Sequence, residues 1–250
     1  LSLSPTEMLK GYLLANITDA HKRTEAAKVW TKRMEALKKL GKDEDSDAIK
    51  AWLRGKYAQS VRDRHQGAEN RDFERIGTEF HRWVKDHEEE LGLHGSEDYF
   101  RFVYQEMAFY TRQYERVRQA SLEPKHGLEP IFHVACWRFT LQYPLLLSGI
   151  TPQDGEELID QKFRIVATFL DILLARRAVN YLSMNFAALS YAIFLVIKEI
   201  RGLSTQAMAD MLHKKLDEQG CDFNGTKDGT RAGFPGFGLN HWSKGYIKTI

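Results

Sequence analysis

The sequence predicts an all-α fold, a multi-helix bundle in two sub-domains with no substantial β-sheet. Apolar residues recur at the three- and four-residue spacing of a helix along most of the chain. Helix breakers are rare, because the 250 residues include only 6 Pro and 18 Gly, and six of these glycines fall together late in the chain. No stretch alternates apolar and polar residues for long enough to predict a strand, and we find no internal repeat.

The first two helices have recognisable starts. Ser4 suits an N-cap, Pro5 suits the first helical position, and Glu7 completes a capping box. The expected apolar stripe of this helix contains Met8, Leu9, Tyr12, Leu13 and Ile17. Thr18 or Asp19 then caps a second helix that runs to about Leu40. Its expected buried face contains Ala27, Trp30, Met34 and Leu37.

Three further helices are predicted in the first half of the chain. The acidic residues 43–45 begin a third helix, because acidic side chains stabilise a helix N-terminus. Its buried side is expected to hold Ile49, Trp52, Leu53, Tyr57 and Val61. A fourth helix is predicted over residues 72–91, with Phe73, Ile76, Phe80, Trp83 and Val84 facing inward. Ser96 is expected to cap a fifth helix that continues through Ala120.

Pro124, Gly127 and Pro130 mark a connection, at which we expect the boundary between two helical sub-domains. Four helices follow in the prediction, at about residues 131–147, 154–174, 177–201 and 205–219. A glycine-rich loop over residues 220–238 and the start of a last helix near Leu239 complete the chain. The chain begins with Leu and ends in the middle of a helical pattern, so we expect a segment cut from a longer intracellular protein.

Positive charge is concentrated near the start of the chain, although the formal net charge is only +2. Between Lys22 and Lys42 there are eight Lys or Arg and two Glu, which gives a local charge of +6. This asymmetry is compatible with a phosphate-binding patch, and the alternative is a solvated helix face. The candidate nucleic-acid-binding residues are Lys32, Arg33, Lys38 and Lys39, together with Arg176 and Arg177, for which a structural salt bridge is the alternative.

No motif predicts a complete active site, so we expect no catalytic residue and no metal or cofactor in this segment. Cys136 and Cys221 lie far apart without metal-binding or redox spacing, which favours free thiols and a reducing cytoplasm. The glycine-rich loop lacks the Gly-Lys-Ser/Thr sequence of a phosphate-binding loop. The apolar stretches 131–150 and 181–197 contain polar residues and read as buried helices rather than membrane spans.

One loose motif supplies an alternative function. Arg82 and His87 have an Arg-x-x-x-x-His spacing that resembles the motif of the helical HEPN ribonucleases. That resemblance implies cleavage of a phosphodiester by these two residues. A second alternative is a structural scaffold that binds protein partners and has no affinity for nucleic acid. Glu123-Pro124-Lys125 has the carboxylate–x–Lys order of some nucleases, but it lies in a predicted turn rather than on a strand.

The opening residues 1–14 resemble the segment Leu-Ser-x-x-Asp-hydrophobic-Leu-Lys-Asn-x-Leu in the N-terminal domain of GmrSD-type restriction endonucleases. Lys10 matches the family Lys, Glu7 replaces the family Asp or lies one residue away from it, and Gly11 departs from the family Asn. The helical middle region of that family is similar to residues 51–58, 76–84 and 169–185 of this chain, and residues 234–235 and 246–247 resemble the approach to its C-terminal HNH-type nuclease domain.

The resemblance implies a three-part protein. Residues 1–18 would end a ParB-like domain that hydrolyses a nucleoside triphosphate, and residues 239–250 would approach an HNH-type nuclease domain that uses a divalent metal such as Mg²⁺. The helical sub-domains 19–123 and 124–238 would link these flanking domains. The implied function is nucleotide-dependent cleavage of modified phage DNA in the bacterial cytoplasm, with homo-oligomerisation possible. The motifs Asp-Gly-Gln-Gln-Arg and His-x-x-Pro are absent, so no catalytic residue is carried over.

Overall fold

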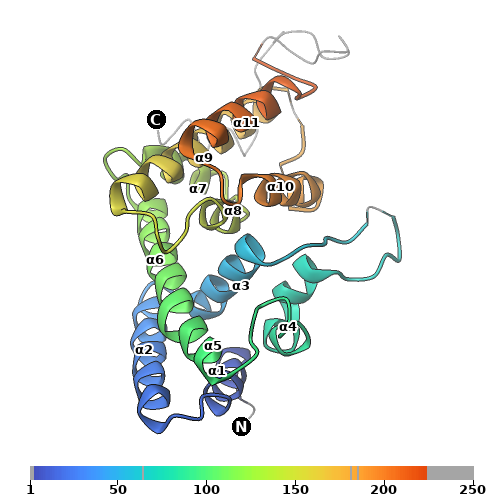
Figure 1. Cartoon of the computed structure of the whole chain (residues 1–250). Helices are drawn as coiled ribbons and strands as arrows, with labels where there is room; N and C mark the ends of the chain where they lie inside the picture. The colour runs from blue at the N-terminus through green and yellow to red at the C-terminus, as the bar shows by residue number, and fades with distance from the viewer. Residues whose placement is uncertain (1–2, 64, 181, 185, 224–250) are drawn as a thin grey trace. The chain divides into compact units, whose positions relative to one another are not determined.

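The computed structural model describes residues 3–63, 65–180, 182–184 and 186–223 (Figure 1). All regular elements in these residues are helices, which confirms the all-α prediction. The chain divides into two compact units, unit 1 over Leu1–Arg118 and unit 2 over Gln119–Ile250. The division falls inside a helix, a few residues before the connection at which the sequence predicts the sub-domain boundary. None of the described helices is long and apolar enough to cross a membrane.

Unit 1 begins with three helices, α1 (Pro5–Ala15), α2 (Ala20–Lys38) and α3 (Glu44–Lys56). The predicted capping box of α1 is present, since Glu7 N donates to Ser4 Oγ and Ser4 N donates to Glu7 Oε2. Asp19 caps α2 through a hydrogen bond from Lys22 N of 2.9 Å. Met8 is exposed rather than buried, and the buried alanine of α2 is Ala26 rather than Ala27.

A long connection leads from α3 to α4 (Asp72–Asp86), and Figure 1 shows it extending away from the helices of unit 1. Asp72, the first residue of α4, binds the start of this connection, because its Oδ2 accepts hydrogen bonds from Gln59 N and Ser60 N at 2.9 and 3.0 Å. The five predicted inward residues of α4 are all buried. The helix is kinked at Glu79 and ends at Asp86, five residues before the predicted end.

The predicted fifth helix has three parts. α5 (Ser96–Arg101) continues into a π-helical turn, η1 (Phe102–Met107), and then into α6 (Ala108–Leu122). Ser96 is the first helical residue rather than the cap; Asp98 instead accepts hydrogen bonds from the amides of His94 and Gly95. α1 packs against α2, α3, α4 and α5, while α2 also packs against η1.

Unit 2 is built around α9 (Glu156–Val179), which packs against α7 (Glu129–Cys136), α8 (Gln142–Ser148) and α11 (Thr205–Asp217). α10 (Phe186–Ile200) packs against α8. The helix predicted over residues 131–147 is therefore two helices, separated at Arg138, whose φ of 57° interrupts the helix. The predicted break before Arg177 is wrong, since α9 continues to Val179. The glycine-rich loop from residue 224 onward and the last predicted helix lie outside the described residues.

Candidate nucleic-acid interface

The solvent side of α2 carries three lysines on one face, which we call the α2 lysine face: Lys28, Lys32 and Lys39. The buried side of the helix is formed by Ala26, Trp30, Met34 and Leu37. At 3.6 residues per turn, the three lysines lie on the side opposite these residues. All three are exposed; Lys28 Nζ forms a hydrogen-bonded pair with Glu25 at 3.0 Å. The α2 lysine face therefore presents ammonium groups to solvent.

Only two of the four candidate residues predicted on α2 belong to this face. Arg33 turns towards α6, where its Nη2 contacts Glu115 Oε2 at 2.7 Å and its Nε donates to Thr111 Oγ1 at 3.2 Å. Lys38 lies on the other side of the α2 lysine face from Arg33, and it pairs with Asp45 at 3.7 Å. Lys32 and Lys39 remain on the solvent side. The local charge of +6 is thus partly neutralised within unit 1.

Lys28 is the member of this face that the sequence interpretation did not select. It precedes Lys32 by four residues, and Lys39 follows Lys32 by seven, so the three share one face of a helix. This spacing could have identified the face, because it excludes Arg33 and Lys38 from it.

Lys10, the residue matched to the family motif, lies on α1 and donates from Nζ to Thr31 Oγ1 of α2 at 3.0 Å. Its contact is therefore one between two helices of unit 1. Glu7, one turn earlier, has its pKa lowered first by the hydrogen bond from the Ser4 amide and also by the nearby positive charges of Lys38 and Lys10. The ammonium of Lys10 therefore contacts the Thr31 hydroxyl, and its charge lies near the Glu7 carboxylate.

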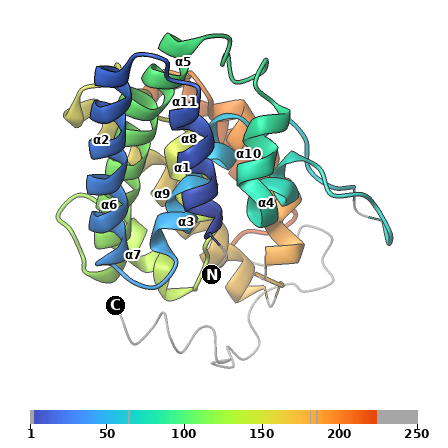
Figure 2. The same ribbon diagram turned by 90° about the horizontal axis from the view of Figure 1, so that it is seen from below.

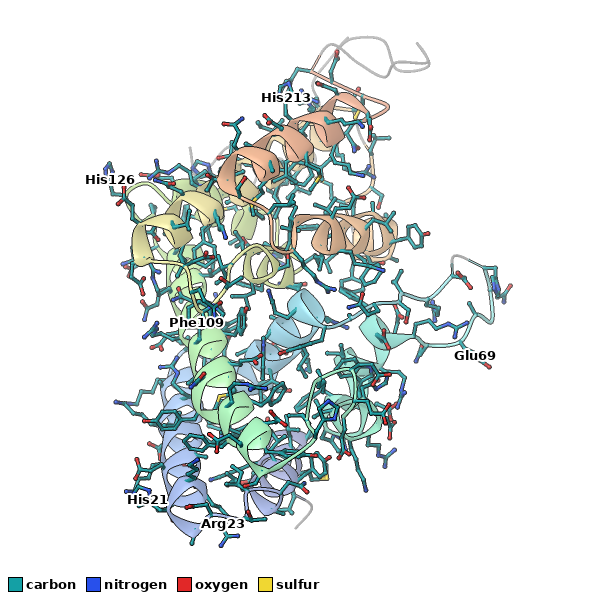
Figure 3. All side chains as sticks on the ribbon, in the orientation of Figure 1. His21, Arg23, Glu69, Phe109, His126 and His213 are labelled. Atoms are coloured by element: carbon teal, nitrogen blue, oxygen red, sulfur yellow. The ribbon has the colours of Figure 1, made fainter. Side chains whose placement is uncertain are left out.

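The start of α2 lies beside α5. Lys22 of α2 forms an ion pair with Glu97 of α5, and Thr18 N donates to Ser96 Oγ at 2.9 Å. Further along, Arg33 contacts Thr111 and Glu115 of α6. The α5–η1–α6 helix therefore runs alongside α2 in the same direction, as Figures 1 and 2 show. Figure 3 labels His21 and Arg23 near the start of α2, and Phe109 near the start of α6.

Arg176 and Arg177 bind main-chain oxygens of unit 2 rather than a carboxylate. Arg176 Nη1 donates to Leu216 O at 2.7 Å, and its guanidinium lies 5.7 Å from the centre of the Phe223 ring. Arg177 donates from Nε and Nη2 to Ser183 O. Burial lowers the pKa of Arg177. Arg176 thus joins the end of α9 to the end of α11, and Arg177 joins α9 to the residues that follow it. Hydrogen bonds to carbonyl oxygens take the place of the predicted salt bridge.

The two residues of the ribonuclease motif have different surroundings. Arg82 is largely exposed and pairs with Glu79 at 3.6 Å. The His87 ring stacks on Trp83 with centroids 4.4 Å apart, and its Nδ1 lies 2.8 Å from Trp83 O. His87 Nε2 lies 3.5 Å from Asp72 Oδ1. Both ring nitrogens of His87 therefore face acceptors within unit 1, which favours a structural role for this residue.

No group of three or more His, Cys, Asp or Glu side chains within the described ranges has the arrangement of a metal site. Both cysteines are free thiols. Glu123 and Lys125 pair with each other at 3.6 Å in the turn after α6. Among the described residues, the candidate site is therefore the cationic surface of α2.

No family model matches this sequence, and comparison with curated proteins and with solved structures likewise finds no match. The resemblance to GmrSD-type endonucleases therefore remains a prediction from the sequence.

Proposed function

We propose that this chain is the non-catalytic helical segment of a nucleotide-dependent, GmrSD-type restriction endonuclease of the bacterial cytoplasm that cleaves modified phage DNA. Within it, unit 1 contacts the DNA backbone through the α2 lysine face. The flanking domains of the same polypeptide would supply nucleotide hydrolysis and Mg²⁺-dependent cleavage. The segment would connect them and add affinity that does not depend on base sequence.

The observation that carries the DNA-binding part is the position of the cations on α2. Lys28, Lys32 and Lys39 lie on one exposed face, on which Lys28 also pairs with Glu25, whereas Arg33 and Lys38 lie off this face and bind Glu115 and Asp45. Lysine ammonium groups that line one helix face can contact successive phosphates without inserting into a groove. Such contacts position a protein on DNA but do not read its sequence.

The test of this part is duplex DNA binding by the 250-residue chain at low salt, measured by fluorescence anisotropy. The double variant Lys32→Gln/Lys39→Gln should bind a labelled duplex several-fold more weakly than the unmodified chain. Lys125→Gln/Lys214→Gln is the matched control, because it removes two exposed charges from unit 2. Equal losses in both variants, or no loss in either, would contradict a contact through the α2 lysine face.

The restriction part needs the longer protein with its flanking domains. With Mg²⁺ and a nucleoside triphosphate, that protein should cleave modified phage DNA and spare the unmodified DNA. The 250-residue chain alone should cleave neither. Failure of the folded longer protein to cleave any modified DNA would reject the restriction assignment, and a chain without affinity for nucleic acid would favour the scaffold alternative. Metal-independent RNA cleavage that His87→Ala abolishes would favour the ribonuclease alternative.

A further inference from the structure

Tyr104 is the one exposed aromatic side chain in the described part of unit 1, with 40% of its surface accessible. Its ring stacks on Phe100, one turn earlier, with ring centroids 4.9 Å apart and an interplanar angle of 21°. Phe100 is itself half-buried. We call this stacked pair the aromatic platform. It leaves part of the Tyr104 side chain open to solvent on the surface of the α5–η1 helix.

The aromatic platform borders the basic helix. The Nζ atom of Lys22 on α2 lies 5.5 Å from the centre of the Phe100 ring, which is within the range of a cation–π contact. Glu97 pairs with Lys22, and Glu25 pairs with Lys28, so a phosphate would compete with these two carboxylates; Lys32 and Lys39 lie further along α2. At a rise of 1.5 Å per residue, Lys28 and Lys32 follow Lys22 by about 9 and 15 Å along the helix axis.

The backbone beneath Tyr104 is unusual. Residues 102–107 form the π-helical turn η1, a rare element that is frequent at functional sites. On the inner side of this turn, Tyr57 Oη donates to the Glu106 carboxylate, and burial raises the pKa of Tyr57 far above its ordinary value. Trp52 packs on Phe102 with ring centroids 4.8 Å apart. These inner contacts hold η1 in place while Tyr104 faces solvent.

Sites that bind unpaired nucleic acid combine aromatic faces, on which bases stack, with basic side chains, along which phosphates lie. Here Tyr104 supplies one exposed ring, and the neighbouring helix α2 supplies the lysines. We propose that the aromatic platform stacks an unpaired nucleobase while the α2 lysine face holds phosphates of the same strand. This inference rests on the proposed function, because it uses the same lysines. It adds a preference for DNA with an unpaired base, since the faces of paired bases are covered by their neighbours in the duplex.

The test compares a fluorescent oligothymidine with a duplex of equal length, using the 250-residue chain in an anisotropy titration at low salt. Tyr104→Ala should weaken binding of the single strand about tenfold and leave duplex binding unchanged. Tyr104→Phe should retain single-strand binding, because it keeps the ring. Met8→Ala is the control for loss of an exposed apolar side chain, since Met8 on α1 is 37% exposed.

A second readout reports stacking directly. The fluorescence of 2-aminopurine in the single strand should be quenched on binding to the unmodified chain and to Tyr104→Phe, but not to Tyr104→Ala. Unchanged single-strand affinity and unchanged quenching in Tyr104→Ala would overturn the platform. If Lys32→Gln/Lys39→Gln loses DNA binding and Tyr104→Ala does not, the proposed function survives without the platform. If Lys32→Gln/Lys39→Gln binds both the single strand and the duplex normally, the proposed function fails.

Discussion

Arg33 and Glu115 form an ion pair with Nη2 and Oε2 2.7 Å apart, and both side chains are mostly buried. The adjacent Lys32, in contrast, is exposed on the solvent side of α2. Two consecutive basic residues of the most basic stretch therefore have different roles. Arg33 stabilises the packing of α2 against α6, and Lys32 is exposed to a ligand.

Substitution of these two neighbours should separate stability from binding. Arg33→Ala leaves the Glu115 carboxylate and the Thr111 hydroxyl without their partner, so it should lower the free energy of unfolding by about 1–3 kcal/mol. Lys32→Ala should change it by less than about 0.5 kcal/mol, as is usual for surface substitutions. Urea unfolding followed by circular dichroism measures both. Equal stability of the two variants would show that the Arg33 contact contributes little.

A side chain added at Gly77 is expected to destabilise unit 1. A Cβ atom there would lie 2.0 Å from Arg54 Nη2. Arg54 is not free to move away, since its Nε donates to Phe73 O at 2.8 Å and burial lowers its pKa to about 10. Gly77→Ala should therefore destabilise the protein by about 1–3 kcal/mol. In thermal unfolding, its midpoint should fall clearly below that of the unmodified chain.

Gly11→Ala is the matched control, because no atom lies within 4 Å of the added Cβ in helix α1. Alanine is favoured over glycine within a helix, so this change should stabilise the protein by about 0.5–1 kcal/mol. An unaffected Gly77→Ala variant would show that the close approach of α3 and α4 is not as described, and a destabilised Gly11→Ala variant would contradict the open space beside Gly11 on α1.

Asp72 should contribute to the acid sensitivity of unit 1. Burial alone would raise its pKa, but hydrogen bonds from the Trp83 indole and from the Gln59 and Ser60 amides outweigh that effect and lower the pKa. A lowered pKa in the folded state stabilises the protein above the unfolded value of about 3.9. This stability is lost as the pH falls from that value through the folded pKa.

Asp72→Asn removes the titrating group and weakens the carboxylate contacts, so it should cost about 1–3 kcal/mol at neutral pH. Its stability should then fall less between pH 5 and pH 3 than that of the unmodified chain, as urea unfolding at each pH would show. Parallel stability curves for the two proteins would mean that Asp72 does not titrate as inferred.

Arg176 gives a prediction for unit 2. Its hydrogen bond to Leu216 O joins α9 to α11, so Arg176→Met should destabilise the protein by about 1–2 kcal/mol. DNA affinity should stay unchanged, because this guanidinium is occupied by contacts within the unit. A stable Arg176→Met variant with weakened DNA binding would restore the nucleic-acid role that the sequence allowed for this residue.

Periodicity predicted most buried faces correctly, since residues such as Trp30 and Phe80 must leave water whatever their detailed neighbours are. It did not predict the break at Arg138, because the left-handed conformation there occurs without Gly or Pro. It also did not predict that Glu44, in the acidic start of α3, is buried. Its partners, Tyr114 Oη at 2.7 Å and Arg118 Nε at 2.6 Å, are distant in sequence.

The candidate interface was predictable only in part for the same reason. Charge density located the basic helix, and the helical repeat could have separated Lys32 and Lys39 from Arg33. However, the ion pair that removes Arg33 from the surface joins residues 82 positions apart. Composition contains no information about such a distant pair. Tyr104 likewise has the residue type of a core position, yet it is exposed in the fold.

The most direct test of the central claim is the salt dependence of duplex DNA binding by the 250-residue chain. The logarithm of the binding constant should fall linearly with the logarithm of the salt concentration, with a slope that counts phosphate contacts. Lys32→Gln/Lys39→Gln should reduce the magnitude of that slope by about 2, whereas Lys125→Gln/Lys214→Gln should leave it unchanged. An identical slope in all three proteins would contradict backbone contact through the α2 lysine face.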